Sequence, residues 1–162
     1  MLFQAPALYR SAYTNRLSIV VTPLKALMED QVQKLWELGF YSSVEAINQD
    51  KVDELPQIYR RLAGGEIRLL FITPERFRSG AFVRAFEQRL ANDQGLEYAV
   101  YDEAHCISQW GHEFRPDYLY SAQVVQRYRK ANLETTKRAF PVLLFSATVS
   151  KKIYEGFEQL FS

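Results

Sequence analysis

Short unbroken runs of apolar residues recur along the chain and are separated by amphipathic stretches. Four such runs cover residues 17–21, 67–72, 96–101 and 142–145, and a weaker one covers 43–47. Runs of this length without polar alternation are typical of strands that are covered on both faces, as in a parallel sheet. The pattern therefore predicts the strands of a parallel α/β sheet.

Between these runs, apolar residues recur at helical spacing. One stripe runs from Leu24 through Leu27 to Trp36 and ends at Gly39, and further helices are predicted over 55–62, 82–90, 117–131 and 153–161. Repeated strand–helix units favour a sheet flanked by helices. The chain opens on a helical pattern at 2–13 with no strand before it, whereas nucleotide-binding sheets normally begin with a strand and a phosphate loop. We therefore expect one domain over residues 1–162 that lacks its first strand and phosphate loop.

The composition of the chain excludes several classes of protein and site but indicates no particular function. Lys and Arg number 20 and Asp and Glu 19, so the formal net charge of +1 neither indicates nor excludes a nucleic acid, which needs local basic clusters. The single cysteine, Cys106, excludes an internal disulfide and a four-thiolate zinc site. No apolar run reaches membrane-spanning length, and the first residues lack a signal-peptide layout. We expect a cytoplasmic protein, nucleoid-associated in a bacterium, with no membrane partner.

The strongest chemical signal is Asp102-Glu103-Ala104-His105, directly after the apolar run 96–101. In a parallel sheet the ligand crevice lies at the carboxyl ends of the strands. There, one carboxylate can hold the Mg²⁺ that bridges the terminal phosphates of ATP, and its neighbour can deprotonate the attacking water. A polar turn after a strand explains the tetrapeptide taken alone equally well.

Three other runs end in polar residues of a similar kind. These are Thr22-Pro23, Thr73-Pro74 and Ser146-Ala147-Thr148. Each Thr-Pro step alone can simply end a strand, because proline blocks further pairing. Four polar ends at one edge of a sheet, however, predict a site that contacts a nucleotide or a polymer.

The segment 106–118 places two large aromatic side chains, a histidine and an arginine on a loop beside the acidic pair. Aromatic faces stack on unpaired bases, at about 1–3 kcal/mol per base, and an arginine adds a phosphate or cation–π contact. The alternative is that Trp110 and Phe114 anchor an ordinary loop in the core, and composition alone slightly favours it.

The stretch from Asp102 to Tyr118, DEAHCISQWGHEFRPDY, resembles motif II and the aromatic-rich loop of the RecQ helicases nearly residue for residue. Residues 19–32, IVVTPLKALMEDQV, resemble that family's motif Ia, and 70–77, LFITPERF, resemble motif Ib. Residues 145–148 resemble motif III, and 2–8 resemble the helix after the phosphate loop. The resemblance covers essentially the whole chain and implies a RecA-like fold of a superfamily 2 helicase.

The resemblance also implies roles for individual residues. Asp102 would position Mg²⁺ and ATP, Glu103 would be the general base, and His105, Ser146 and Thr148 would couple nucleotide state to DNA. Sensing of single-stranded DNA would fall to Gln109, Trp110, His112, Phe114 and Arg115, and the DNA backbone would be touched by Thr22, Pro23, Thr73 and Pro74. The implied activity is ATP-dependent 3′-to-5′ unwinding by the intact protein, with DNA as single strands and duplex junctions.

Departures from the family pattern shape the remaining expectations. The sequence contains no Gly-Lys-Ser/Thr phosphate loop and no second domain with an arginine finger. We therefore expect the chain alone to be inactive, and a missing strand to leave a sheet edge open for self-association. Two alternatives stay open: a non-catalytic DNA-binding or interaction module, and a metal-dependent hydrolase that uses Asp102 and Glu103. The lack of further clustered carboxylates argues against the hydrolase.

Overall fold

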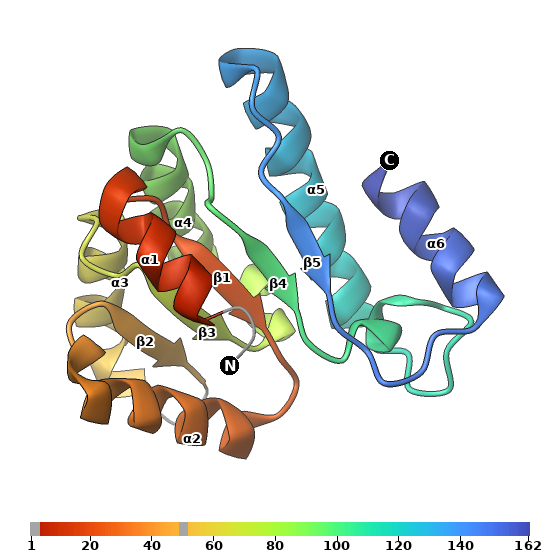
Figure 1. Cartoon of the computed structure of the whole chain (residues 1–162), viewed down its shortest axis with the longest axis horizontal. Coiled ribbons are helices and arrows are strands. Elements are labelled where there is room, and N and C mark those ends of the chain that lie inside the picture. Colours follow the sequence, from red (N-terminus) through yellow and green to blue (C-terminus); the bar gives the residue numbers. More distant parts are fainter. Residues whose placement is uncertain (1–3, 49–51) are drawn as a thin grey trace.

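The computed structural model describes residues 4–48 and 52–162 and has a single parallel sheet at its centre (Figure 1). Its five strands lie in the order β2-β3-β1-β4-β5. Their bounds are β1 Ser18–Val21, β2 Val44–Ile47, β3 Leu69–Ile72, β4 Ala99–Tyr101 and β5 Val142–Leu144. Each predicted apolar run contains one of these strands, so the predicted parallel α/β sheet flanked by helices is confirmed.

Six α-helices are described: α1 Gln4–Thr14, α2 Lys25–Leu35, α3 Leu55–Ala63, α4 Gly80–Asp93, α5 Pro116–Thr136 and α6 Lys151–Phe161. Short helical turns lie at η1 Trp36–Phe40, η2 Val52–Glu54, η3 Pro74–Arg78 and η4 Ala104–Ile107. The α2 segment stops where predicted, because Gly39 takes a φ of 99° inside η1 and breaks the helical path. None of the described helices is both long and apolar enough to cross a membrane.

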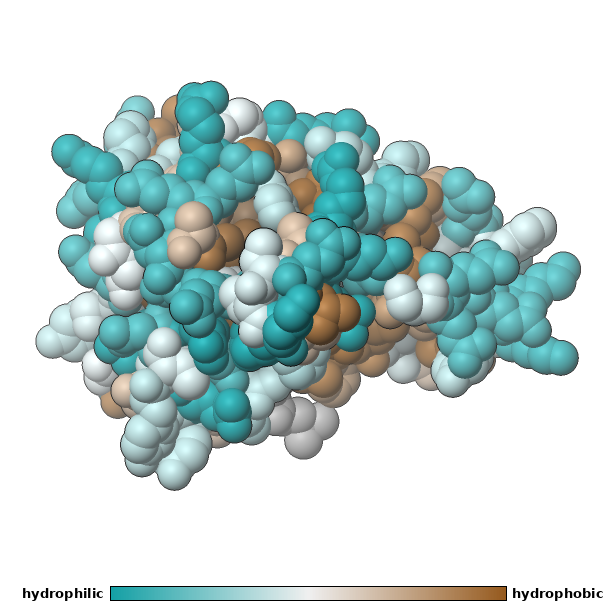
Figure 2. Space-filling model, turned by 90° about the horizontal axis from the view of Figure 1, so that it is seen from above, coloured by the Kyte–Doolittle hydropathy of each residue, from teal (hydrophilic) through white to brown (hydrophobic). Residues whose placement is uncertain are grey.

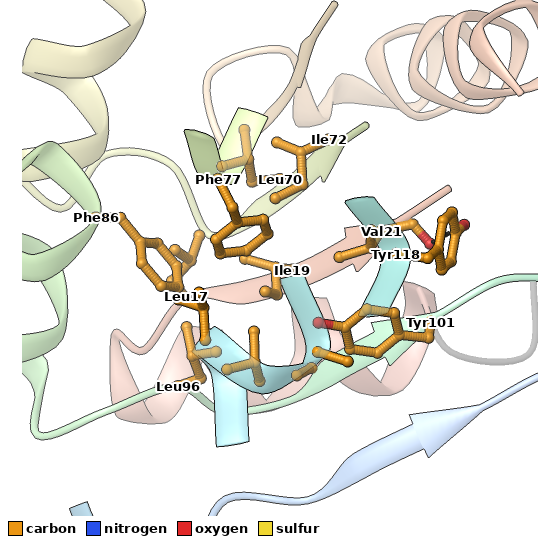
Figure 3. Close-up of a cluster of buried hydrophobic side chains, with 14 of the residues drawn as sticks. Leu17, Ile19, Val21, Leu70, Ile72, Phe77, Phe86, Leu96, Tyr101 and Tyr118 are labelled. Carbon is orange, nitrogen blue, oxygen red and sulfur yellow. Dashed lines mark hydrogen bonds between the residues drawn. The ribbon is translucent and has the colours of Figure 1, made fainter. Parts of the chain in front are cut away.

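The helices cover the two faces of the sheet, and successive strand residues supply the two cores. In β1, Ile19 and Val21 join a core with α3, α4, α5 and α6, part of which Figure 3 shows, whereas Val20 joins a second core with α1 and α2. This alternation follows from the opposite directions of neighbouring side chains in a strand. Both faces of the central strands are therefore buried, which explains their unbroken apolar runs.

Two sequence expectations about helices were wrong in detail. Leu24 and Leu27, assigned to the buried stripe of α2, are 44% and 41% exposed, because only one narrow side of that helix meets the sheet. The helix predicted over 117–131 instead runs from Pro116 to Thr136 and ends where Lys137 adopts a left-handed conformation. A polar C-terminal half conceals this length, because amphipathic periodicity reports only the part of a helix that packs on a core.

The outer strand β5 differs from the other strands in burial. All residues of β1 to β4 are buried, whereas Val142, Leu143 and Leu144 are only half-buried. A cavity of about 420 Å³ opens beside β5 and is lined by residues of β5 and α6. Figure 2 shows hydrophobic side chains (brown) nearer the middle of the molecule, between mostly hydrophilic ends. Self-association through an open sheet edge stays a prediction, and β5 is the edge strand that would take part in it.

A buried carboxylate ties α1 to the rest of the fold. The side chain of Glu97 is 2% exposed and forms ion pairs with Arg10 of α1, with Arg16 at 3.6 Å and with Arg138 at 3.5 Å. Burial alone would raise the pKa of Glu97, but hydrogen bonds from Arg10 and Thr14 and the charges of Arg10 and Arg138 outweigh burial and lower it. The charged form is thus stabilised, and three segments distant in sequence meet on one carboxylate.

Replacing Glu97 with Gln should destabilise the fold by about 2 kcal/mol, because the guanidinium groups of Arg10, Arg16 and Arg138 would lose the buried counter-charge that they share. The carboxylate of Glu97 stabilises the folded state fully above the pKa that it has in the unfolded chain, about 4.3. This stabilisation is lost as the pH falls through the lower pKa of Glu97 in the folded state. The difference between wild type and Glu97→Gln should therefore shrink below about pH 4 in urea titrations. Glu134→Gln, on the exposed side of α5, is the control; an equal effect of both variants would contradict the role of Glu97.

Candidate functional site

The acidic pair lies directly after β4 and is held by backbone hydrogen bonds from both neighbouring strands. The Asp102 amide donates to Val21 O at 2.9 Å, and the Ala104 amide donates to Phe145 O at 2.8 Å. Between them, Glu103 has a φ of 53°, in the left-handed region that side chains other than glycine rarely adopt. Such a conformation costs about 1–3 kcal/mol and persists only where the surroundings impose it, which is common at functional sites.

The four polar strand ends meet at one edge of the sheet, as predicted. Val21 is in register with Ile72 of β3 and with Tyr101 of β4, and Tyr101 is in register with Leu144 of β5. The residues that follow these strands therefore lie side by side. Thr22, Thr73 and Pro74 are buried there and Pro23 is half-buried, so their role in DNA contact stays a prediction and would involve the backbone of these segments.

A histidine joins three parts of this edge. His105 Nδ1 lies 2.7 Å from Ser146 Oγ and 3.5 Å from a Glu103 carboxylate oxygen, and His105 Nε2 lies 2.8 Å from Glu113 Oε2. Ser146 Oγ in turn donates to Thr148 O at 3.1 Å. The predicted grouping of Glu103, His105, Ser146 and Thr148 is thus present in the geometry, with His105 at its centre.

Glu113 belongs to this group although sequence reasoning assigned it no role. Its hydrogen bond to His105 and the charge of His105 lower the pKa of Glu113, and Arg115 adds to this effect. The side chain is otherwise 71% exposed, so the contact with His105 is what holds it. The sequence does show a carboxylate eight residues after His105. Its contact with His105 could not be predicted, because spacing alone does not tell whether the intervening loop folds back.

The aromatic-rich loop folds back because its backbone is pinned to η4. The Arg115 amide donates to Cys106 O at 2.9 Å, and the Gly111 amide donates to Ser108 O at 3.0 Å. A Cβ atom at Gly111 would lie 2.9 Å from His105 O, so only glycine permits this approach. At the end of the loop, the Tyr118 hydroxyl donates to Asp102 O at 2.7 Å (Figure 3 shows Tyr118 beside Val21).

The loop presents its functional candidates to solvent. Trp110 is 68% exposed and carries Lys152 Nζ over its ring at 5.1 Å from the centroid. Gln109, His112 and Arg115 are also exposed, and Phe114 is half-buried. The core-anchor alternative is therefore wrong for Trp110, whereas Cys106 is the small residue buried in the core.

A cavity of about 540 Å³ connects Glu103 of the acidic pair with the aromatic-rich loop. Its lining includes Glu103, His105, Trp110, His112 and Thr148. Asp102 and Glu103 fit a magnesium site of the ATPase kind, since Mg²⁺ prefers oxygen ligands and takes one or two carboxylates beside phosphate oxygens. The cavity thus places a candidate general base and an exposed aromatic ring around one space.

A second group of possible metal ligands lies beside the acidic pair. His105, Cys106 and Glu113 offer ligand atoms within 4.8 Å of one another. However, burial raises the pKa of the Cys106 thiol, which disfavours the thiolate that binds metals. His105 and Glu113 already satisfy each other, so the three residues are better described as a hydrogen-bonded group beside a buried thiol.

The exposure of Trp110 gives a direct test of the loop. Trp110→Ala should change the free energy of unfolding by less than about 0.5 kcal/mol, as is usual for surface positions. Trp36 is the matched control, because its indole donates to Val44 O at 2.8 Å and packs against the second core. Trp36→Ala should cost about 2 kcal/mol or more. Urea unfolding of both variants is the measurement, and a large loss in Trp110→Ala would restore the core-anchor interpretation.

Comparison with known proteins places this chain in a family. The DEAD/DEAH box helicase family matches residues 1–155. The chain is 42% identical over 121 residues to the ATP-dependent DNA helicase RecQ of Bacillus subtilis, covering 72% of this chain and 18% of that protein. It is 34% identical over 154 residues to the RecQ-like DNA helicase blm-1 of Caenorhabditis elegans, covering 93% of this chain and 14% of that protein.

Solved structures agree on the fold. Crystal structures of the DUF1998 helicase MrfA bound to DNA, and bound to DNA and AMPPNP, match with TM-scores of 0.65 and 0.63 at 20% and 18% identity. Each match covers 96% of this chain and 21% of that one. The chain thus spans under a quarter of the length of these relatives, and the predicted RecQ resemblance is confirmed over most of it. The chain belongs to the DEAD/DEAH box helicase family, with RecQ-like helicases among its relatives.

Proposed function

We propose that this chain is the part of an ATP-dependent DNA helicase that hydrolyses ATP and senses single-stranded DNA, and that the intact protein unwinds duplexes 3′ to 5′. The observation that supports this most is the His105 group, which joins Glu103 to motif III at Ser146 and to the aromatic-rich loop at Glu113. The names of the relatives, RecQ-like DNA helicases, support the same assignment.

The acidic pair would carry the hydrolytic chemistry. Asp102 would hold Mg²⁺, which when bound stabilises the charge on the phosphate oxygens, and Glu103 would orient and deprotonate the attacking water. The left-handed backbone at Glu103 turns its carboxylate into the cavity shared with His105. Catalysis of this kind depends on positioning, so small shifts of Glu103 would change the rate strongly.

The loop would report DNA to this pair through His105. A strand that binds Trp110, with contacts to Gln109, His112, Phe114 and Arg115, would shift the backbone that carries Glu113. Since Glu113 and Ser146 hold the two nitrogens of the His105 ring, a shift of the loop reorients the ring and hence its contact with Glu103. Hydrolysis and DNA binding would be coupled by this one side chain.

The Thr73-Pro74 segment, which we expect to contact the DNA backbone, is also connected to the aromatic-rich loop. Arg78 of η3 forms an ion pair with Asp117 and lies over the Tyr120 ring at 4.3 Å from its centroid. This links the Thr73-Pro74 segment to the start of α5, directly after the aromatic-rich loop. A strand that crosses the sheet edge from Pro74 toward Trp110 would therefore meet segments that move together.

Replacement of Glu103 by Gln tests the proposed chemistry in the full-length protein. Turnover of ATP should fall about 10²–10⁴-fold, because a general base is lost, while ATP binding stays measurable. Glu37→Gln, at an exposed position in η1, should leave turnover unchanged. Near-normal turnover in Glu103→Gln would show that another group activates the water, and metal-dependent activity without nucleotide would favour the hydrolase alternative.

The isolated 162-residue chain should bind ATP weakly and hydrolyse it negligibly. The sequence contains no Gly-Lys-Ser/Thr loop, whose amides and lysine hold the β- and γ-phosphates, and no arginine finger, which contributes about 10³–10⁵ in rate where it occurs. Calorimetric titration with Mg²⁺ and ATP, and phosphate release with and without single-stranded DNA, measure this. DNA-stimulated turnover at an ordinary helicase rate of about 1 s⁻¹ or more would contradict it.

A further inference from the structure

We propose that Trp110 and Lys152 together bind one nucleotide step of single-stranded DNA, with the base on the indole face and the ammonium on the adjacent phosphate. The inference rests on the proposed function, because it requires the aromatic-rich loop to meet DNA. It adds a residue outside the loop, at the start of α6, for which neither the motifs nor the resemblance predicted a role.

The two side chains already lie against each other. Lys152 Nζ is 5.1 Å from the centroid of the Trp110 ring, within the range of a cation–π contact. Trp110 is 68% exposed and Lys152 is exposed, so a ligand can reach both from solvent. The contact joins segments 42 residues apart, and it brings a stacking surface and a cation to one place.

Lys152 occupies an electrostatically unfavourable position. It lies in the first turn of α6, where the helix carries partial positive charge and where no acidic residue compensates it. Within the described part of the chain, no carboxylate lies within 4.0 Å of its ammonium, whereas the neighbouring Lys151 pairs with Glu155 at 3.8 Å. A phosphate would supply the counter-charge that the protein itself does not supply to Lys152.

An incoming nucleotide can exchange with the resting contact. A base stacks on an aromatic face irrespective of its identity, and it would take the place of the ammonium over the ring. The displaced ammonium sits on a flexible four-carbon stem and can turn to the phosphate of the same nucleotide, with which it forms a charge-assisted hydrogen bond. The cation–π contact is thus replaced by two interactions, and the site favours no sequence.

The position of Trp110 links this step to the catalytic cavity. The indole lines the cavity that contains Glu103 and His105, and it also lines a second cavity of about 300 Å³ between α5 and α6. A base on the exposed indole would change both spaces at once. DNA bound at this site would therefore lie close enough to Glu103 to affect it.

The test compares Lys152, which lies over Trp110, with its neighbour Lys151, which pairs with Glu155. Fluorescence anisotropy with a labelled oligodeoxythymidine, at several salt concentrations, measures the affinity of the 162-residue chain. Lys152→Gln should weaken binding about 3–10-fold and lower the slope of log affinity against log salt by about 0.7, the value for one phosphate contact on a single strand. Lys151→Gln should change affinity less than about twofold, and Lys152→Arg should bind like wild type.

A second measurement isolates the stacking half of the site. In a Trp36→Phe background, emission from Trp110 reports directly on its face, and it should change with oligodeoxythymidine but not with an abasic strand of equal length. The abasic strand should still bind more weakly to Lys152→Gln than to Lys151→Gln. Melting temperatures of the lysine variants should match wild type, because neither lysine packs in a core.

The outcomes separate this inference from the proposed function. If Trp110→Ala weakens binding while Lys152→Gln and Lys151→Gln behave alike, the loop binds DNA and the paired site is wrong. If wild type shows no salt-dependent DNA binding at all, the DNA-sensing part of the proposed function fails, and the inference fails with it. A loss specific to Lys152→Gln that Lys152→Arg restores supports the pair.

Discussion

The site depends above all on how β4 is hydrogen-bonded between β1 and β5. Two backbone bonds, from Asp102 to Val21 O and from Ala104 to Phe145 O, bracket Glu103 and leave it no room to relax. The Tyr118 hydroxyl donates a hydrogen bond to the carbonyl oxygen of Asp102, and Tyr118 itself is fully buried. The backbone of the acidic pair is therefore part of the sheet and its core, and the aromatic-rich loop is attached to it.

With increasing distance from β4, the side chains of this site are held by fewer contacts and are more exposed. His105 is held at both ring nitrogens, Glu113 is held at one oxygen, and Trp110 is 68% exposed with Lys152 Nζ over its ring. Such a gradient suits a sensor, because the outermost contacts are the weakest and change first when a ligand arrives. At Gly111 the loop passes so close to His105 O that a side chain there would clash with it.

Much of this could be predicted from the sequence, because buried parallel strands have an unmistakable pattern. Each apolar run became a strand, and the convergence of Thr22, Thr73, Asp102 and Ser146 followed from parallel topology alone. Side-chain partners were less accessible, since the bond between Glu113 and His105 requires a fold-back that no spacing rule encodes. The exposure of Trp110 was equally hidden, because an indole is as suited to a core as to a surface platform.

The left-handed backbone at Glu103 has a consequence for how this position can vary. A glycine there would relieve conformational cost and make the fold more stable, although the carboxylate would be lost. A valine or isoleucine would lose the carboxylate and also add strain, since branching at Cβ is poorly tolerated at positive φ. Under the proposed role of Glu103 in hydrolysis, the residue that suits stability at position 103 differs from the residue that suits activity. Glu103 thus carries a backbone cost that a glycine would avoid, and such costs are common at functional sites.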